Sequence, residues 1–197
     1  MNELDVAIST AKQAGAYLLS MFGSAQRVSY KSDTSPVTQT DLESSKMIQG
    51  RIAAAFPQHT ILCEELPDAL TRTIGSEPTW IIDPLDGTSN FVAQIPLFGV
   101  AIGLLENRQT KIGVIFDPLH NELFVAQAGL GATLNGKPLR VSNRKTVRGA
   151  MLFAGRGYRD RDHERHGQII YALEQQTTYF RRLGCAATML SSVAAGR

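Results

Sequence analysis

The stretch Trp80-Ile-Ile-Asp-Pro-Leu-Asp-Gly-Thr-Ser-Asn-Phe91 says most about the fold of this chain and about its chemistry. Its apolar start, Trp80 to Ile82, predicts a buried strand that ends at Asp83-Pro84. Asp86 follows three residues after Asp83, and carboxylates at the end of a strand suit a hard cation such as Mg²⁺. Gly87-Thr88 predicts the start of a helix, where free N–H groups bind phosphate well. A metal and a phosphate in one turn indicate metal-assisted transfer of a phosphoryl group to water.

The same stretch resembles the signature of the inositol monophosphatase family, W-I-(I/V)-D-P-(I/L)-D-G-T-x-N-F, and fills every fixed position of it. An isolated D-G-T would be better interpreted as a turn or a helix cap, because these residues are common there. The unbroken match along the signature favours the functional interpretation. The motif also differs from the D-x-D-G-T of phosphatases that form a phospho-aspartate, because Pro84 and Leu85 both separate Asp83 from Asp86. We therefore expect no covalent aspartyl intermediate.

Two upstream segments extend the resemblance. Cys63-Glu64-Glu65 matches the family's G-E-E segment with Cys in place of Gly, and Pro36-Val-Thr-Gln-Thr-Asp41 resembles its P-V-T-x-A-D segment. The resemblance implies that Glu64 is a ligand shared by two metal ions. It also implies that Asp41 is hydrogen-bonded to Thr88, so that the two orient the attacking water. From the residues alone, Glu64 and Glu65 could be surface charges after a strand, and Asp41 could be the N-cap of the following helix as well as a catalytic group.

A downstream segment, Arg182-Leu-Gly-Cys-Ala-Ala187, matches the family's R-x-G-S-A-A, whose backbone lies beside the substrate. The resemblance implies that Gly184, Cys185 and Ala186 contact the substrate. Cys185 replaces the usual small polar residue. No plausible base stands near it in the sequence, so we expect a packed side chain at a helix start rather than a catalytic thiol.

The resemblance as a whole implies an Mg²⁺-dependent phosphomonoesterase in which water attacks the phosphate directly. The implied ligands of one or two Mg²⁺ ions are Glu64, Asp83, the carbonyl of Leu85, and Asp86. The implied substrate contacts nearby are Leu85, Asp86, Gly87 and Thr88. The implied catalytic residues are Asp41, Glu64 and Thr88, which would activate or orient a water that the metal makes more acidic. The expected substrate is an inositol phosphate or a sugar phosphate, since Ser89-Asn90-Phe91 resembles that branch of the family, whereas the nucleotide branch usually has Lys-Glu-Phe.

Other functions stay open at this point. Within the family, histidinol phosphate, fructose bisphosphate and 3′-phosphonucleotides are alternative substrates, and a non-catalytic scaffold or binding protein could retain the fold. The family continues past Val193-Ala-Ala-Gly-Arg197 to a W-D-x-A-A-G segment, whose aspartate holds the second metal and contacts the substrate; this sequence stops before it. We therefore expect a fragment or a naturally short relative that binds metal, hydrolyses phosphate esters poorly and exposes apolar surface.

The periodicity along the chain predicts helices on both sides of a run of strands, which is a layered α+β arrangement. We expect helices over 4–22, 40–56, 168–175 and 188–195, and a loop over 66–78. We expect further strands over 60–63, 99–105, 111–116, 122–127, 139–141, 151–154 and 180–183, with a hairpin turn at Asn135-Gly136. The resemblance implies an α-β-α-β-α sandwich over residues 1–197 as one domain, without the family's C-terminal elements.

Composition and charge narrow the kinds of partner and the cellular setting that we expect. The chain has 197 residues, 43% of them hydrophobic, and a net charge of +2 without a basic cluster among aromatics, so we expect no nucleic-acid partner. The sequence shows neither a signal-peptide pattern nor an apolar run of membrane-spanning length, so we expect no membrane partner. Its two cysteines are far apart, which indicates a reduced, cytoplasmic setting. We expect a homodimer that acts on a small phosphorylated substrate.

Overall fold

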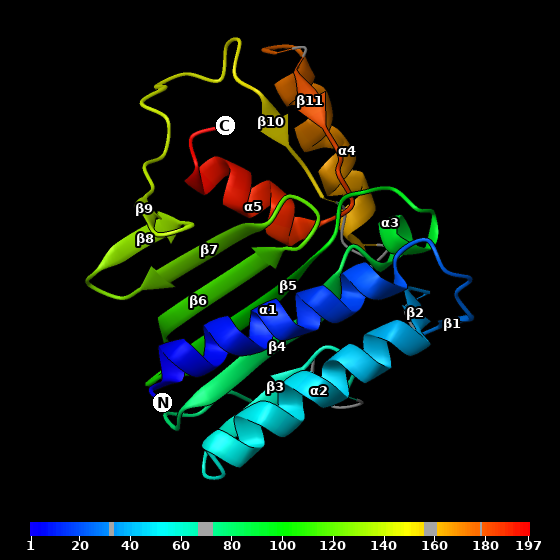
Figure 1. The fold of residues 1–197 in the computed structure, drawn as a ribbon. Coiled ribbons are helices and arrows are strands. Elements are labelled where there is room, and N and C mark those ends of the chain that lie inside the picture. Colours follow the sequence, from blue (N-terminus) through cyan, green and yellow to red (C-terminus); the bar gives the residue numbers. More distant parts are fainter. Residues whose placement is uncertain (32–33, 67–72, 156–160, 178) are drawn as a thin grey trace.

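A mixed seven-stranded sheet forms the centre of the computed structural model, which describes residues 1–31, 34–66, 73–155, 161–177 and 179–197 (Figure 1). β3 and β4 are parallel, and every other neighbouring pair in the sheet is antiparallel. The strands, in spatial order, are β3 (Thr60–Cys63), β4 (Thr79–Asp86), β5 (Gly99–Glu106), β6 (Gln109–Asp117), β7 (Glu122–Gln127), β8 (Gly131–Leu134) and β9 (Lys137–Pro138). Because β3 and β4 run in the same direction, the residues at their carboxyl ends lie at one edge of the sheet.

Two long helices cover one face of this sheet. α1 (Glu3–Met21) packs against β5 and β6, and α2 (Gln39–Ala55) packs against β3 and β4. Small and apolar residues recur along α1 at helical spacing, and the side chain of Asn2 accepts a hydrogen bond from the backbone of Asp5 to cap its start. The buried core between helices and sheet includes Leu18, Ile48, Ile52, Trp80, Ile82, Leu85, Phe91, Phe98 and Ile102.

The other face of the sheet carries α5 (Ala186–Ala194), which packs against β5 and β6. On its far side α5 lines a cavity together with β10 (Leu152–Phe153), which is parallel to β11 (Phe180–Arg181). α4 (Arg161–Glu174) lies next to β11, so the layers follow one another as predicted (Figure 1). The predicted α+β class with its layered order is therefore confirmed. In the described part of the chain, every helix is too short or too polar to cross a lipid bilayer.

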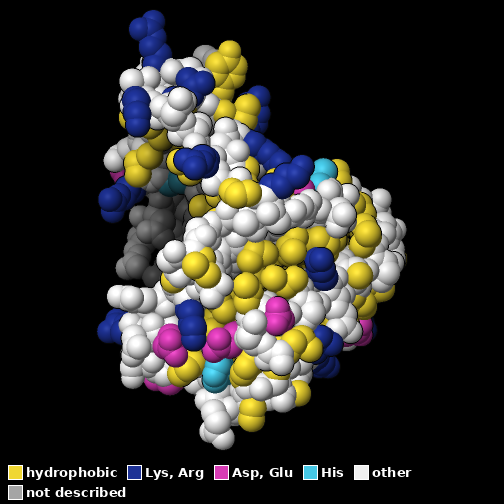
Figure 2. All heavy atoms as spheres, turned by 60° about the vertical axis from the view of Figure 1, so that its left-hand side comes forward, with side chains coloured by type: hydrophobic (Ala, Val, Ile, Leu, Met, Phe, Trp, Pro, Cys, Tyr) yellow, Lys and Arg dark blue, Asp and Glu magenta, His cyan; other side chains and the backbone are white. Residues whose placement is uncertain are grey.

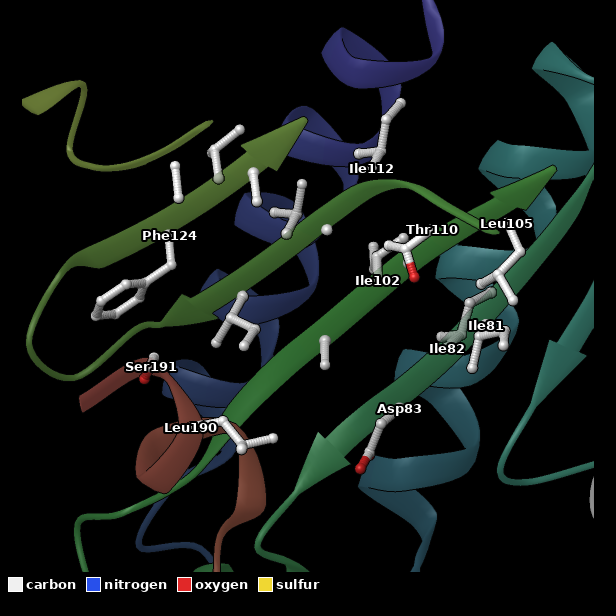
Figure 3. A pocket seen from close by; sticks show the side chains of 18 of the residues that line it. Ile81, Ile82, Asp83, Ile102, Leu105, Thr110, Ile112, Phe124, Leu190 and Ser191 are labelled. Carbon is white, nitrogen blue, oxygen red and sulfur yellow. The ribbon is translucent and has the colours of Figure 1, made fainter. Parts of the chain in front are cut away.

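A large apolar cavity of about 860 Å³ lies between α5 and the sheet face that α1 and α2 leave open. Figure 3 looks onto this face: Ile81, Leu105 and Phe124 project from the strands, and α5 crosses one end. Leu190 of α5 lines the cavity and is 67% exposed. On the molecular surface, hydrophobic side chains gather in a patch that contains few charges (Figure 2). Asp83 stands at the edge of this apolar face, toward the carboxyl end of β4 (Figure 3).

Some predicted elements differ from the structure. β4 does not end at Asp83 but continues to Asp86 through a break in its pairing. The hairpin turn at Asn135-Gly136 has the two positive φ angles that it needs, 49° and 79°, yet the predicted strand over 139–141 is wrong. The strand there covers Lys137–Pro138 alone, and one further hydrogen bond, from the Leu139 N–H to the Ala132 carbonyl at 2.8 Å, follows it. The helix predicted over 168–175 begins earlier, at Arg161. The loop predicted over 66–78 is confirmed where the structure describes it, at 66 and 73–78, and its other residues lie outside the described part of the chain.

A short antiparallel hairpin, β1 (Val28–Tyr30) with β2 (Pro36–Thr38), leads into α2. α2 begins two residues before Asp41, because Thr38 and Asp41 form a capping box in which each side chain bonds the other's backbone. The alternative that Asp41 is the N-cap is therefore wrong: Thr38 is the N-cap, and Asp41 is the third residue of the helix. The hairpin and α2 bring Lys31 and Asp41 to the edge of the sheet where β3 and β4 end.

Candidate metal and phosphate site

A bulge in β4 places its two aspartates on the same side of the sheet. Asp83 pairs with Ala101 of β5 and Asp86 pairs with Gly99, so three steps along β4 match two along β5. In a regular strand, residues three apart point to opposite faces, and the one extra residue restores a common side. Leu85 belongs to the buried core on the opposite side.

The bulge also frees main-chain groups from the ladder. Pro84 is tolerated here because no ladder N–H is required of it, and its carbonyl accepts a hydrogen bond from Ser44 Oγ at 2.9 Å. The Leu85 N–H donates to Asp83 Oδ1 at 3.2 Å. The Leu85 carbonyl oxygen lies 3.1 Å from Thr88 Oγ1. Side-chain and main-chain oxygens thus converge at one turn.

Gly87 allows the chain to turn from β4 into α3 (Thr88–Val92). It has φ +93°, and a Cβ at this position would lie 2.8 Å from the Leu97 carbonyl oxygen. Both the left-handed backbone and the close approach require glycine. The prediction of a helix start at Gly87-Thr88 is confirmed.

The Thr88 hydroxyl donates a hydrogen bond to Asp41 Oδ1 at 2.7 Å, which is the contact that the family resemblance implies. Asp41 is fully buried, and its other oxygen accepts from both the N–H and the hydroxyl of Thr38. Burial raises the pKa of Asp41, and the bonds from Thr38 and Thr88 oppose that rise. Asp41 therefore serves the start of α2 with one oxygen and Thr88 with the other.

Glu64 and Glu65 follow β3, and both carboxylates bind the same ammonium group. Lys31 Nζ lies 2.9 Å from Glu64 Oε1 and 2.9 Å from Glu65 Oε1. The Glu65 side chain is 6% exposed and the Glu64 side chain 46%, so the alternative of two free surface charges does not describe them. Burial raises the pKa of Asp83 well above its usual range, and the nearby charges of Glu64 and Asp86 raise it further.

Asp86 connects the bulge to the start of α5. Its carboxylate accepts a hydrogen bond from the backbone N–H of Ala187 and lies 3.3 Å from Cys185 Sγ. Burial, with the Asp86 charge second, raises the pKa of Cys185 to about 12. The group stays a thiol at neutral pH and can donate a hydrogen bond to Asp86. Cys185 is buried at the N-cap of α5, as expected of a packed side chain.

These groups surround one cavity of about 280 Å³. The predicted site residues that line it are Glu64, Asp83, Leu85, Asp86, Gly87, Thr88, Gly184, Cys185 and Ala186. Asp41 does not line the cavity but bonds Thr88, which does. The structure thus brings together segments that are up to about 150 residues apart in the sequence.

The donor atoms of the cavity fit Mg²⁺ in kind, because they are carboxylate and carbonyl oxygens. Their arrangement is not that of a loaded site: among the described residues, no three Asp, Glu, His or Cys side chains are placed to hold one ion. Glu64 is engaged by Lys31, and Asp86 is engaged by Ala187 and Cys185. Coordination by Glu64, Asp83 and Asp86 therefore requires these side chains to turn, and their ligand role stays a prediction.

Sequence reasoning missed two residues of this site. Lys31 lies in a polar stretch that carries no motif. Asn90 occupies a fixed position of the signature, and that position is the only feature of the sequence that indicates a role for it. Its side chain donates to the Leu97 carbonyl at 2.9 Å and to the Leu183 carbonyl at 2.7 Å. Asn90 thereby holds the segment before Gly184 against α3.

Comparisons with known proteins point in one direction. The family model described as "Inositol monophosphatase family" matches residues 2–197. A protein named Nus factor SuhB from Vibrio cholerae is 36% identical over 197 residues, which cover 98% of this chain and 73% of that protein. The crystal structure of the extragenic suppressor protein suhB from Bartonella henselae superposes with a TM-score of 0.88 at 32% identity, covering 98% of this chain and 74% of that one. The structure of inositol monophosphatase from Anabaena gives a TM-score of 0.80 at 38% identity, covering 98% and 70%.

Proposed function

Because the chain belongs to the inositol monophosphatase family, we propose that it hydrolyses a small phosphate monoester with the help of Mg²⁺. The observation that carries the proposal is the hydrogen bond from Thr88 to the buried Asp41, next to the carboxylates and the carbonyl that line the cavity. A hydroxyl that donates its hydrogen bond to a buried carboxylate keeps the lone pairs of its own oxygen free. It can then accept a hydrogen from a water molecule and fix the direction in which that water points.

Each group of the cavity has a part in the proposed reaction. Glu64, Asp83, the Leu85 carbonyl and Asp86 would hold Mg²⁺. When bound, the ion supplies Lewis acidity, which favours ionisation of water and neutralises charge on the phosphate and the leaving oxygen. The N–H groups at the start of α3, from Gly87 and Thr88, would hold the phosphate.

The substrate contacts extend to the start of α5. The Gly184–Ala186 backbone lines the same cavity, and Asn90 holds the segment before it against α3. A cavity of about 280 Å³ is at the small end for ligand sites. An inositol phosphate or a sugar phosphate is therefore the proposed substrate class.

A non-catalytic role is the second candidate, and one finding favours it. The relative from Vibrio cholerae is named Nus factor SuhB rather than a phosphatase. We propose as the alternative that this chain keeps the fold and the metal-binding groups for a factor role of that kind, without turnover.

One experiment separates these candidates. Purified chain is incubated with inositol 1-phosphate, a hexose phosphate, histidinol phosphate, fructose bisphosphate and a 3′-phosphonucleotide, with Mg²⁺ or with EDTA, and phosphate is measured. Mg²⁺-dependent release that Thr88→Val abolishes and Thr88→Ser partly retains supports the phosphatase. Absence of release from every ester, with Mg²⁺ binding intact, supports the factor role.

The route of phosphoryl transfer is tested by isotope. In ¹⁸O-labelled water, direct attack puts one label into each phosphate during a single turnover, and acid quench traps no phosphoenzyme. Recovery of a phosphorylated Asp83 or Asp86 would overturn attack by water.

A further inference from the structure

Lys31 holds a position that the proposed reaction does not use. It follows β1, and its backbone is fixed by two hydrogen bonds: its N–H donates to the Ser35 carbonyl at 2.9 Å, and its carbonyl accepts from the Thr34 N–H at 3.0 Å. Its side chain reaches across to Glu64 and Glu65 and bonds both at 2.9 Å. The Lys31 side chain is 23% exposed, so it is partly withdrawn from water.

The contact between Lys31 and the two glutamates offsets negative charge at the site. Five carboxyl groups lie at this edge of the sheet, on residues Asp41, Glu64, Glu65, Asp83 and Asp86. Among the residues that the structure describes, Lys31 alone forms ion pairs with any of them. Carboxylates this close repel one another unless a cation lies among them. Lys31 supplies that cation from within the chain.

The ammonium group also restrains one of the carboxylates that must turn to bind a metal ion, Glu64. Glu64 is the proposed ligand that bonds Lys31, whereas Asp83 bonds its own turn at Leu85 and Asp86 bonds the start of α5. A carboxylate oxygen that accepts from an ammonium group at 2.9 Å has that lone pair occupied. It can serve a metal ion there only after the ammonium group withdraws.

We propose that Lys31 is the internal counter-cation of the metal-free site, which a divalent cation must displace from Glu64, and that Lys31 thereby sets the metal affinity. The inference rests on the proposed function, since it takes Glu64 to be a ligand. A protein whose binding-competent form is populated for part of the time binds with proportionally lower apparent affinity. Glu65 retains the ammonium group after the exchange, so its charge stays close and continues to oppose the metal.

The test compares two lysine-to-methionine substitutions. Lys31→Met keeps the aliphatic stem and removes the charge. Lys111→Met is the matched control, because Lys111 also bonds two carboxylates, Glu3 at 3.3 Å and Glu106 at 3.4 Å, away from the site. Lys31→Gln is a second variant that keeps a hydrogen-bond donor should Lys31→Met fail to fold.

The readouts are binding and stability rather than turnover. Titration of EDTA-treated, dialysed protein with MgCl₂ and MnCl₂ in a calorimeter should give affinity about tenfold higher for Lys31→Met than for the unsubstituted chain, which is the size expected of a partly exposed double ion pair. Lys111→Met should bind as the unsubstituted chain does. In EDTA, Lys31→Met should unfold at a lower temperature, and saturating Mg²⁺ should raise its midpoint by more.

The outcomes separate this inference from the proposal on which it rests. If the unsubstituted chain binds metal and Lys31→Met binds it no more tightly, then Lys31 is not a counter-cation that the metal displaces. The proposed metal site is unaffected by that outcome. Binding by Lys31→Met alone supports the displacement in its strongest form. If none of the variants binds a divalent cation, the metal site itself is wrong and the inference falls with it.

Discussion

Removal of the Thr88 hydroxyl is the sharpest test of the candidate site, and Thr88→Val removes it with little change in side-chain shape. The structure predicts a loss of folding stability and a separate loss of reaction rate. Asp41 is fully buried and loses one of three groups that donate to it. A hydrogen bond to a charged, buried acceptor contributes about 1.5–3 kcal/mol. The midpoint of thermal unfolding should therefore fall by roughly 3–12 °C for a chain of this size.

The second loss is kinetic and larger. A group that orients the attacking water contributes about 10²–10⁴ in rate, or roughly 3–5 kcal/mol in the barrier. Affinity for Mg²⁺ should change little, since the Thr88 side chain is not a proposed ligand. The lost bond opposed the raised pKa of Asp41, so that pKa rises further. The acid limb of the activity profile should move to higher pH.

The assays are phosphate release from inositol 1-phosphate at saturating Mg²⁺, calorimetric metal titration, and thermal unfolding. Thr88→Ser is the control, because it keeps the hydroxyl and loses a methyl group. Full activity in Thr88→Val, or activity in Thr88→Ser no higher than in Thr88→Val, would refute the assigned role. The unfolding measurement is informative without turnover, because it reports the bond to Asp41 directly.

Three further changes test neighbouring parts of the site. Asp86→Asn should keep the fold and lose most Mg²⁺ affinity, because an amide is a poorer ligand for a hard cation; equal calorimetric affinity would remove Asp86 from the ligand set. Gly87→Ala should lower the free energy of unfolding by about 1–3 kcal/mol, since it strains a φ of +93° and meets the Leu97 carbonyl at 2.8 Å; an unchanged denaturant midpoint would contradict this. In EDTA, stability should fall as pH rises from the unfolded pKa of Asp83 through its raised folded value, because the folded state binds more protons over that interval. Thermal midpoints measured from pH 5 to 8 should show a flatter slope in Asp83→Asn, and an equal slope would assign the effect elsewhere.

Local signals in the sequence were sufficient for most of the elements. Period-2 and helical spacing located the central strands and long helices, and glycine predicted the turn at Gly87 correctly. The capping box was visible as Thr38-x-x-Asp41, yet Asp41 was interpreted as a possible N-cap, because the sequence does not show which residue leaves the helical conformation first. The strand predicted over 139–141 failed because pairing at a sheet edge depends on neighbours that are not local.

The site depended more heavily on contacts between distant segments. Strand periodicity alone places Asp83 and Asp86 on opposite faces, and only pairing with β5 creates the bulge that unites them. The contact between Thr88 and Asp41 came from the family resemblance, which encodes such long-range information. Lys31 and the donor role of Asn90 carried no local signal, since a lysine in a polar loop and an asparagine after a helix start are both ordinary.

At the bulge in β4, substitutions of Leu85 change the side chain but leave its main-chain carbonyl oxygen in place. The main-chain oxygen of Leu85 is free of the ladder and faces the cavity turn, while the Leu85 side chain packs in the core. Selection on the side chain therefore records packing and not chemistry at this position. An alanine scan would see Leu85→Ala as a cavity mutation that costs about 2–5 kcal/mol, and would leave the carbonyl in place. Only replacement of the Leu85–Asp86 amide by an ester, which makes that carbonyl oxygen a weaker electron donor, would test this proposed ligand, because no codon change can remove it.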